Sequence, residues 1–174
     1  MSLLRKNPLK LCSHPCKCGY YGHPTKPCQC SFQEIKRYRT KISGPVLDRI
    51  DIHLEVPPVD YKDLLKNSNK PQTSSSEIKQ KVLAARKIQE KRYGTKLKTN
   101  AKLKPKEIKK YCILEPKAQA FLEKAAEKFS FSSRAIHKIL KLARTIADLE
   151  ENDIILKHHI TEAVQYRSLE KNIW

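Results

Sequence analysis

Apolar residues return at helical spacing over most of the carboxyl-terminal half of the chain. The strongest pattern lies between Ser132 and Glu150, where six apolar residues share one face of a helix. Similar spacing predicts helices over Glu77–Tyr93, Lys104–Cys112, Pro116–Phe129 and His158–Leu169. Since each helix has an apolar face to bury, we expect a bundle of about four or five helices. The six residues of the strongest pattern are Ile136, Ile139, Leu140, Ala143, Ile146 and Ala147.

One short segment has the period of a strand instead. From Ile50 to Val56, four apolar residues alternate with three polar ones, and Pro57 and Pro58 stop the pattern. A lone strand needs partners for its backbone groups, and nothing else in the sequence alternates as clearly. We therefore predict one strand of an incomplete α/β region and interpret the chain as a fragment of a larger fold.

The segments around this strand predict loops, a basic helix and a linker. Residues 1–31 are rich in Pro, Gly, Cys and His, whereas Phe32–Ile42 has the spacing of a helix. The polar stretch Lys66–Ser76 predicts a linker, and Ser74 with Glu77 has the capping-box pattern of a helix start. We therefore divide the chain into an α/β remnant over residues 1–61, a linker over 62–76 and a helical domain over 77–174.

The charge of the chain is strongly basic. Lysine and arginine total 36 against 18 acidic residues, which gives a formal net charge of +18. An excess of this size favours polyanionic partners such as DNA or RNA. The alternative is that scattered lysines only solvate the helix faces. Charge by itself leaves both readings open.

The sequence contains neither a long apolar run nor the pattern of a secretory signal. This excludes a transmembrane helix of about 18 or more apolar residues. We therefore expect a cytoplasmic protein without a membrane partner. Of its six cysteines, four form close pairs that suit a metal or reduced thiols better than disulfides, whereas Cys12 and Cys112 lie outside these pairs.

Four of the cysteines form two C-x-C pairs. Cys16 and Cys18 are separated from Cys28 and Cys30 by a loop that contains Gly and Pro. Four thiolates suit tetrahedral Zn²⁺, which would order a loop with little apolar content. The more usual spacing is C-x-x-C, so reduced loop thiols remain the alternative. His14 and His23 are possible substitute ligands.

Three separated blocks of sequence resemble the Mg-chelatase-like AAA+ ATPases of the ComM/YifB type. The first runs from CKCGYYGHPTKPCQC to DRIDIHLEVPPVDY, the second is SSRAIHKILKLARTIADLE and the third is EAVQYRSL. The resemblance covers nearly the whole chain from Pro15 onward, in the family's order and spacing. It implies a part of a ring ATPase whose nucleotide lies between neighbouring subunits, and the ComM branch is associated with DNA handling in natural transformation.

The resemblance also implies roles for particular residues. Arg49, with Asp48 before it, matches the arginine finger, which reaches the nucleotide of a neighbouring subunit and stabilises charge during phosphoryl transfer. Arg134 matches the sensor-2 arginine at the start of a lid helix, where backbone N–H groups favour phosphate. The alternative for Arg49 is a structural ion pair with Asp48 or Asp51.

The chain also departs from the family pattern. It contains no G-x-x-x-x-G-K-[ST] sequence and no acidic strand to hold Mg²⁺. ATP and Mg²⁺ are therefore expected only in the complete protein, and we expect no hydrolysis by this chain alone. The family has Asn-Pro before the first C-x-C pair, with the Asn as sensor 1, whereas this chain has His14-Pro15. We assign no sensor role to His14.

Two hypotheses of function follow. In the first, the chain is a mainly α lid bundle with an incomplete α/β remnant, which supplies Arg49 and Arg134 to complementing AAA+ subunits and takes part in DNA processing. In the second, it is a zinc-stabilised, basic nucleic-acid-binding module that uses no nucleotide. Salt-sensitive DNA binding by the isolated chain would support the second.

Overall fold

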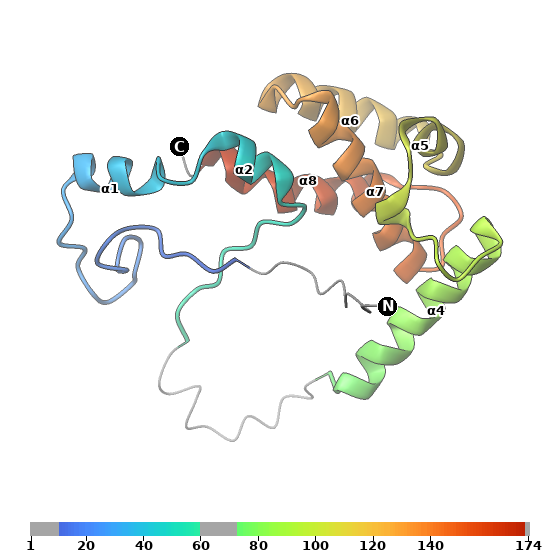
Figure 1. The fold of residues 1–174 in the computed structure, drawn as a ribbon, viewed down its shortest axis with the longest axis horizontal. Coiled ribbons are helices and arrows are strands. Elements are labelled where there is room, and N and C mark those ends of the chain that lie inside the picture. The colour runs from blue at the N-terminus through green and yellow to red at the C-terminus, as the bar shows by residue number, and fades with distance from the viewer. Residues whose placement is uncertain (1–10, 60–72, 173–174) are drawn as a thin grey trace, which may run out of the picture. The chain divides into compact units, whose positions relative to one another are not determined.

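The computed structural model describes residues 11–59 and 73–172, with side chains described as far as Arg167. Its regular structure is almost entirely helical, which confirms the mainly α fold class (Figure 1). The chain forms two compact units, one within residues 1–43 and the other within residues 44–173. None of the helices in the described ranges combines the length and apolar content needed to cross a bilayer.

The first unit contains the cysteine-rich loop and helix α1 (Phe32–Arg39). Ser31 and Glu34 form a capping box at its start, since each side chain bonds the backbone N–H of the other residue. The helix ends three residues before the predicted limit at Ile42, and Thr40 is its C-cap. Only Ile35 of this helix is buried, so apolar packing stabilises few of its turns and the helix is short.

The second unit contains the remaining helices of the described residues. They are α2 (Gly44–Arg49), α4 (Ser75–Tyr93), the short 3₁₀ helix η1 (Asn100–Lys102), α5 (Pro105–Tyr111), α6 (Pro116–Phe129), α7 (Ser133–Leu149) and α8 (Lys157–Asn172). All but α2 and η1 were predicted. The bounds of α6 are as predicted, and those of the other helices differ by up to three residues. The Gly44–Pro45 pair begins α2, because Pro is well tolerated in a first helical turn.

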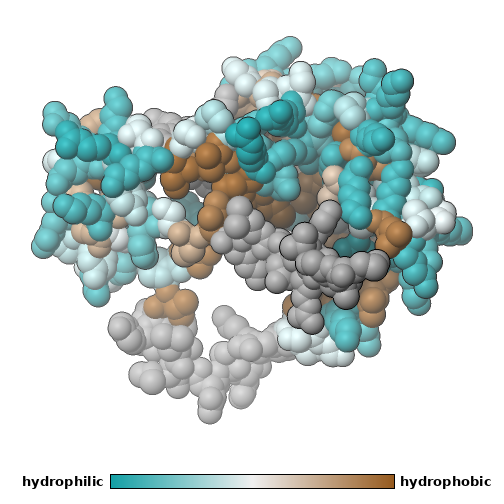
Figure 2. All heavy atoms as spheres, in the orientation of Figure 1, coloured by the Kyte–Doolittle hydropathy of each residue, from teal (hydrophilic) through white to brown (hydrophobic). Residues whose placement is uncertain are grey.

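Helix α7 provides the centre of the bundle. It contacts α8, α4, η1 and α5, and α6 packs against α8. Its side chains Ile139, Ala143 and Ala147 are completely buried, Ile146 is buried and the other two residues of its predicted apolar face are half-buried. The apolar face predicted for this helix is therefore confirmed. Figure 2 shows a mostly hydrophilic surface over α5 and α6, which carry exposed Lys and Glu residues.

Helix α4 packs over its second half only. Its start has the predicted capping box of Ser74 and Glu77, and Gly94 ends it with φ 68°, a left-handed conformation that favours glycine. Ala85 is buried, whereas Ile78 and Val82, which lie on the same apolar stripe of the helix, are 52% and 45% exposed. The stripe is therefore buried only where α4 contacts α7.

The predicted strand does not form. Residues 52–59 have no regular secondary structure, and the apolar side chains of Ile52, Leu54 and Val56 are exposed. Within the described residues the isolated parallel bridge between Leu114 and Ile155 is the only β pairing. The strand prediction was wrong for this chain, because an alternating segment becomes a strand only when a second strand takes up its backbone groups.

A buried ionic network holds the end of α7. Asp148, which is fully buried, accepts hydrogen bonds from Arg92 at 2.5 and 3.0 Å, from Arg144 at 3.1 Å and from Asn100 at 2.7 Å. Arg144, also fully buried, donates to the backbone carbonyls of Asn152 and Asp153 in the loop before α8. The network satisfies these buried charges and joins α4, η1, α7 and the loop.

The domain boundary that we placed at residues 62–76 falls largely outside the described residues. The division into 1–61, 62–76 and 77–174 therefore stays a prediction. Residues 44–59 belong to the same compact unit as the helical bundle. This placement matters for function, because it joins Asp48 and Arg49 to the helix that carries Arg134.

Candidate functional site

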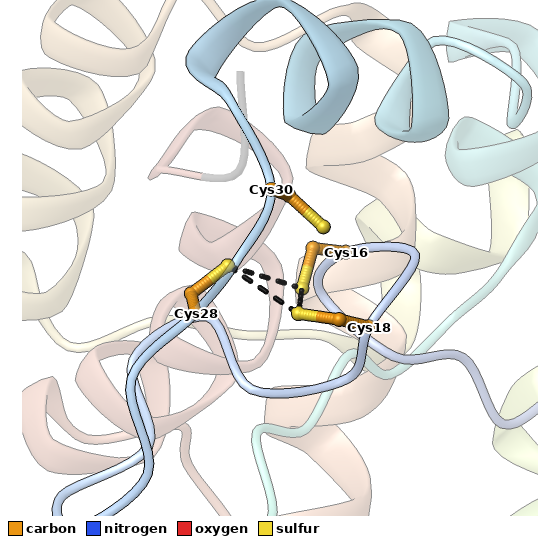
Figure 3. Close-up of side chains that lie close together, drawn as sticks. All are labelled: Cys16, Cys18, Cys28 and Cys30. Atoms are coloured by element: carbon orange, nitrogen blue, oxygen red, sulfur yellow. Dashed lines mark hydrogen bonds between the residues drawn. The ribbon is translucent and has the colours of Figure 1, made fainter.

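The four cysteines of the C-x-C pairs point their sulfurs toward one centre (Figure 3). The Sγ of Cys16 lies 3.4 Å from that of Cys18 and 3.7 Å from that of Cys28, and the Cys18 and Cys28 sulfurs are 3.5 Å apart. All four sulfurs, Cys30 included, lie within 4.8 Å of one another. Around a tetrahedral Zn²⁺ with bonds of about 2.3 Å, sulfurs are separated by about 3.8 Å. The arrangement therefore fits a four-thiolate metal centre.

The backbone of the loop brings these sulfurs together. Gly19 and Gly22 have φ of 81° and 78°, the left-handed region that glycine adopts without strain. The N–H of Gly19 donates to the carbonyl of Cys16 at 3.1 Å, and the N–H of Tyr21 donates to the Cys16 sulfur at 3.3 Å. Helix α1 is attached to the loop by Arg39, whose Nε donates to the Pro15 carbonyl at 3.1 Å.

The thiols of this cluster differ in acidity. Backbone N–H groups of Tyr20 and Gln29 donate to Cys18 and lower its pKa to about 6. The N–H of Cys30 lowers the pKa of Cys28, but desolvation and the neighbouring thiols outweigh that bond and raise it to about 12. One thiolate therefore forms readily, whereas ionising all the thiols requires a cation among them.

Neither of the proposed substitute ligands joins the cluster. The group of metal-ligand atoms within 4.8 Å contains the four sulfurs and excludes His14 and His23. His14 is exposed. The Nδ1 of His23 accepts hydrogen bonds from the backbone N–H groups of Thr25 and Lys26, at 3.2 and 3.1 Å. His23 therefore stabilises the turn instead of completing a metal site.

The two arginines singled out in the sequence line one hollow in the second unit. This hollow of about 450 Å³ lies between α2 and the start of α7, and Arg49 and Arg134 both border it. The N-cap of α7 is Ser132, whose Oγ accepts from the N–H of Ala135 at 3.1 Å. The first turn of a helix presents backbone N–H groups and a positive dipole end, so the hollow favours an anion.

Arg134 and Arg49 have different surroundings. The Arg134 side chain is 65% exposed, and its Nη1 lies 3.7 Å from Oδ2 of Asp48. Arg49 is exposed at the end of α2, and its Nη1 donates to the Pro45 carbonyl one turn earlier at 3.0 Å. Neither guanidinium is buried, so both can reach a ligand at modest cost.

Asp48 pairs with arginines distant in sequence instead of its neighbour Arg49. Its carboxylate lies 3.7 Å from Arg134 and 3.5 Å from the fully buried Arg167 of α8. Asp51 lies 2.9 Å from Nζ of Lys138. The ion pairs within the described residues thus assign both carboxylates to α7 and α8. The pairing of Arg49 with Asp48 or Asp51, which we considered from the sequence, is not among them.

Sequence reasoning missed Arg167 and Lys138, which bind the backbone on either side of Arg49, at Asp48 and Ile50. A signal for Arg167 was present, because it follows Ile160 and Val164 at helical spacing and so occupies an apolar face. An arginine on an apolar helix face is either buried with hydrogen-bond partners, or the face has been predicted wrongly. Lys138 had no comparable signal, because it is one of many lysines on helix surfaces.

A second group of possible metal ligands, Glu150, His158 and His159, suits a metal poorly. Both imidazole Nε2 atoms lie near one Glu150 oxygen, at 2.8 Å for His158 and 3.0 Å for the buried His159. The Nδ1 of His159 accepts the N–H of Leu156 at 2.9 Å, so a neutral ring carries its proton on Nε2 and donates to Glu150. With that tautomer His159 has no Nε2 lone pair to offer, and the group serves instead to fasten the start of α8.

Comparison with known proteins identifies two family regions. Residues 72–167 match the family described as magnesium chelatase, subunit ChlI C-terminal, and residues 7–64 match magnesium chelatase, subunit ChlI. The chain is 44% identical over 137 residues to the Competence protein ComM of Haemophilus influenzae, an alignment that covers 79% of this chain and 26% of the relative.

Other relatives give the same picture. The chain is 38% identical over 159 residues to the uncharacterized protein YifB of Escherichia coli, which covers 91% of this chain and 30% of YifB. It is 28% identical over 144 residues to the uncharacterized protein Rv2897c of Mycobacterium tuberculosis, covering 81% of this chain and 27% of the relative. The chain spans less than a third of the length of each relative, and by these matches it belongs to the magnesium chelatase ChlI family, beside ComM and YifB.

Proposed function

We propose that this chain is the lid-bearing part of an AAA+ ATPase and works only beside subunits that hold the phosphate-binding loop. The observation that carries the proposal is the hollow bordered by Arg49 and Arg134 at the start of α7. The amino terminus of α7 and the permanently charged guanidinium of Arg134 there suit a nucleotide phosphate, and Arg49 is exposed at the edge of the hollow, as a finger that serves a neighbouring subunit requires. Membership in the magnesium chelatase family supports this choice of ligand.

In this proposal the two arginines act on different nucleotides. Arg134, on α7, contacts the phosphates of the nucleotide bound within its own subunit of the ring. Arg49 contacts the nucleotide bound by the neighbouring subunit. A guanidinium that reaches the transferring phosphoryl group stabilises charge as it develops. In this proposal ATP and Mg²⁺ are held by the phosphate-binding loop of the complete protein, which is not among the 174 residues of this sequence.

The metal of the cysteine cluster is, in our proposal, a structural Zn²⁺ held by Cys16, Cys18, Cys28 and Cys30. The separations of the sulfurs and the shortage of buried apolar side chains in the first unit support it. When bound, the ion supplies folding energy. The four protein ligands would complete the tetrahedron, which leaves no position for catalysis.

DNA is the polyanion that we propose as the substrate of the complete assembly. The net charge of +18 and the similarity to a protein named for competence support this. We do not retain the nucleotide-free module as a second candidate, because family membership covers both units of the chain. DNA binding by the complete assembly is expected to weaken steeply as salt rises, since lysine and arginine contacts to phosphate release counterions.

The test is reconstitution of ATP hydrolysis. The chain is mixed with a ComM-type subunit that carries the phosphate-binding loop but has its own finger arginine replaced, and the rate of phosphate release is measured. Arg49→Ala and Arg49→Lys should lower the stimulated rate by about 10³-fold or more, since a lysine cannot replace the forked guanidinium. Arg86→Ala, an exposed arginine on α4, is the matched control. An undiminished rate of phosphate release with Arg49→Ala would contradict the assignment of Arg49 as the arginine finger.

A further inference from the structure

The segment that carries Arg49 is held to α7 and α8 by two side chains. Nζ of Lys138 donates to the carbonyl of Asp48 at 2.8 Å, and Nη1 of Arg167 donates to the carbonyl of Ile50 at 2.6 Å. These carbonyls belong to the residues immediately before and after Arg49. The backbone of Arg49 is therefore fastened on both sides.

The surroundings make these two contacts strong. Arg167 is fully buried and the Lys138 side chain is only 18% exposed, so solvent screens neither charge well. Each cation also pairs with a carboxylate of the segment, Arg167 with Asp48 at 3.5 Å and Lys138 with Asp51 at 2.9 Å. The Asp51 side chain is 73% exposed, so solvent screens that pair and the backbone contacts contribute more. Hydrogen bonds with a charged donor are about twice as strong as neutral ones.

A third contact continues the attachment along α8. The N–H of His53 donates to the carbonyl of Tyr166 at 2.9 Å, one residue before Arg167. His53 follows Asp48 and Ile50, the residues that the two cations contact, in the sequence. The segment from Asp48 to His53 thus follows the helix pair over several residues, although it forms no strand.

Helix α7, which carries Lys138, also carries Arg134. Arg134 and Lys138 are four residues apart on α7, so they share one face of the helix. Arg134 also contacts the segment directly through its ion pair with Asp48 at 3.7 Å. An anion that draws Arg134 away from Asp48 leaves that carboxylate to Arg167 and leaves the two backbone contacts in place.

We propose that Lys138 and Arg167 are positioning residues that couple Arg49 to the α7–α8 pair. A phosphate bound at Arg134 moves α7, and through Lys138 and Arg167 the same movement resets the direction in which Arg49 points. The occupancy of one nucleotide site is thereby passed to the finger that serves the next site. This rests on the proposed function for the roles of the two arginines, whereas the attachment of the segment to the helices does not.

The attachment is tested by hydrogen exchange on the chain itself. Lys138→Met removes the contact to Asp48, and Lys141→Met is the matched control, because Lys141 is also on α7 and its Nζ donates to the Ala101 carbonyl at 3.0 Å. We expect the amides of Ile50 and His53 to exchange about tenfold faster or more in Lys138→Met, and unchanged in Lys141→Met. Unchanged amides of Ala143 and Ile146 would show that the core is intact. Equal exchange of Ile50 and His53 in the two variants overturns the inference.

The coupling is tested in the reconstituted ATPase. Lys138→Met and Arg167→Lys should lower the stimulated kcat and leave the KM for ATP unchanged, and Lys138→Arg, which keeps a cationic donor, should restore it. If Arg49→Ala leaves stimulation intact, the proposed function fails. The hydrogen-exchange result still tests whether the segment is attached to α7 and α8. If Arg49→Ala abolishes stimulation and neither Lys138→Met nor Arg167→Lys lowers it, the coupling is overturned and the finger assignment stands.

Discussion

Arg134 in the first turn of α7 forms an ion pair with Asp48 at the end of α2, with 3.7 Å between Nη1 and Oδ2. The arginine that we assign to nucleotide phosphate is therefore already held by a carboxylate of the same chain. Phosphate and Asp48 compete for one guanidinium. This competition predicts how anion binding responds when the carboxylate is removed.

Asp48→Asn should tighten the binding of tripolyphosphate or ATP to the chain. A partly exposed ion pair is worth about 0–1 kcal/mol, so the gain in affinity is at most about fivefold. Asn keeps a side-chain oxygen that can accept from Arg167. Isothermal titration calorimetry of both proteins measures the difference. The same substitution in an Arg134→Ala background is the control, and a gain that persists there would show that Asp48 acts on some other group.

Ile139→Asp should unfold the helical bundle. Ile139 is completely buried at the centre of α7, and an aspartate there would be a charge without a partner. We expect loss of the helical circular dichroism signal at 25 °C or a large fall in Tm. Ile113→Asp, at a side chain that is 59% exposed, introduces the same charge and should change Tm little. Equal melting curves for the two variants would contradict the packing described for α7.

Replacing one cysteine of the cluster should remove the metal and loosen the first unit alone. Cys16→Ser deletes the fully buried sulfur of the four, and a hydroxyl is a poor substitute for thiolate toward Zn²⁺. We expect about one zinc per chain by elemental analysis, lost in this variant or after chelation. Exchange of the α1 amides should rise, while the Tm of the bundle stays unchanged. Cys12→Ser, an exposed cysteine outside the cluster, is the control and should keep the metal.

Glu150 should make the stability of the bundle depend on pH. Hydrogen bonds from His158 and His159 hold the pKa of Glu150 below its ordinary value of 4.5. A carboxyl group with a lowered folded-state pKa stabilises the protein above its unfolded pKa, and this contribution is lost as pH falls through the folded pKa. The wild type should therefore exceed Glu150→Gln in free energy of unfolding at pH 6. The difference should shrink as pH falls below 4.5 and disappear once pH is below the lower pKa of the folded protein.

Urea unfolding at a series of pH values measures this difference. The matched variant is Glu127→Gln on the exposed face of α6, which also removes one negative charge but no contact with the histidines. A Glu150→Gln protein that follows the wild type at every pH would show that these contacts contribute nothing to stability. The linkage would then be absent.

Local sequence signals determined the helices. Ser74 with Glu77 begins α4 and Gly94 ends it, and the predicted bounds of α6, Pro116–Phe129, are those of the structure. These signals act within one turn of the chain, through capping side chains, proline and glycine. The spacing of the C-x-C pairs was a local signal too, and the four sulfurs do meet.

Long-range contacts decided the rest. The alternating residues from Ile50 to Val56 have the pattern of a strand, but a strand requires the backbone of a second chain segment. The backbone of α8 supplies one hydrogen bond, from the N–H of His53 to the carbonyl of Tyr166. Similarly, a sequence shows that Asp48, Lys138 and Arg167 are charged but not that they meet. The chain alone thus determined its helices and its cysteine cluster, because these depend on neighbours in sequence, whereas only the packing of α7 against α8 decided what holds Arg49.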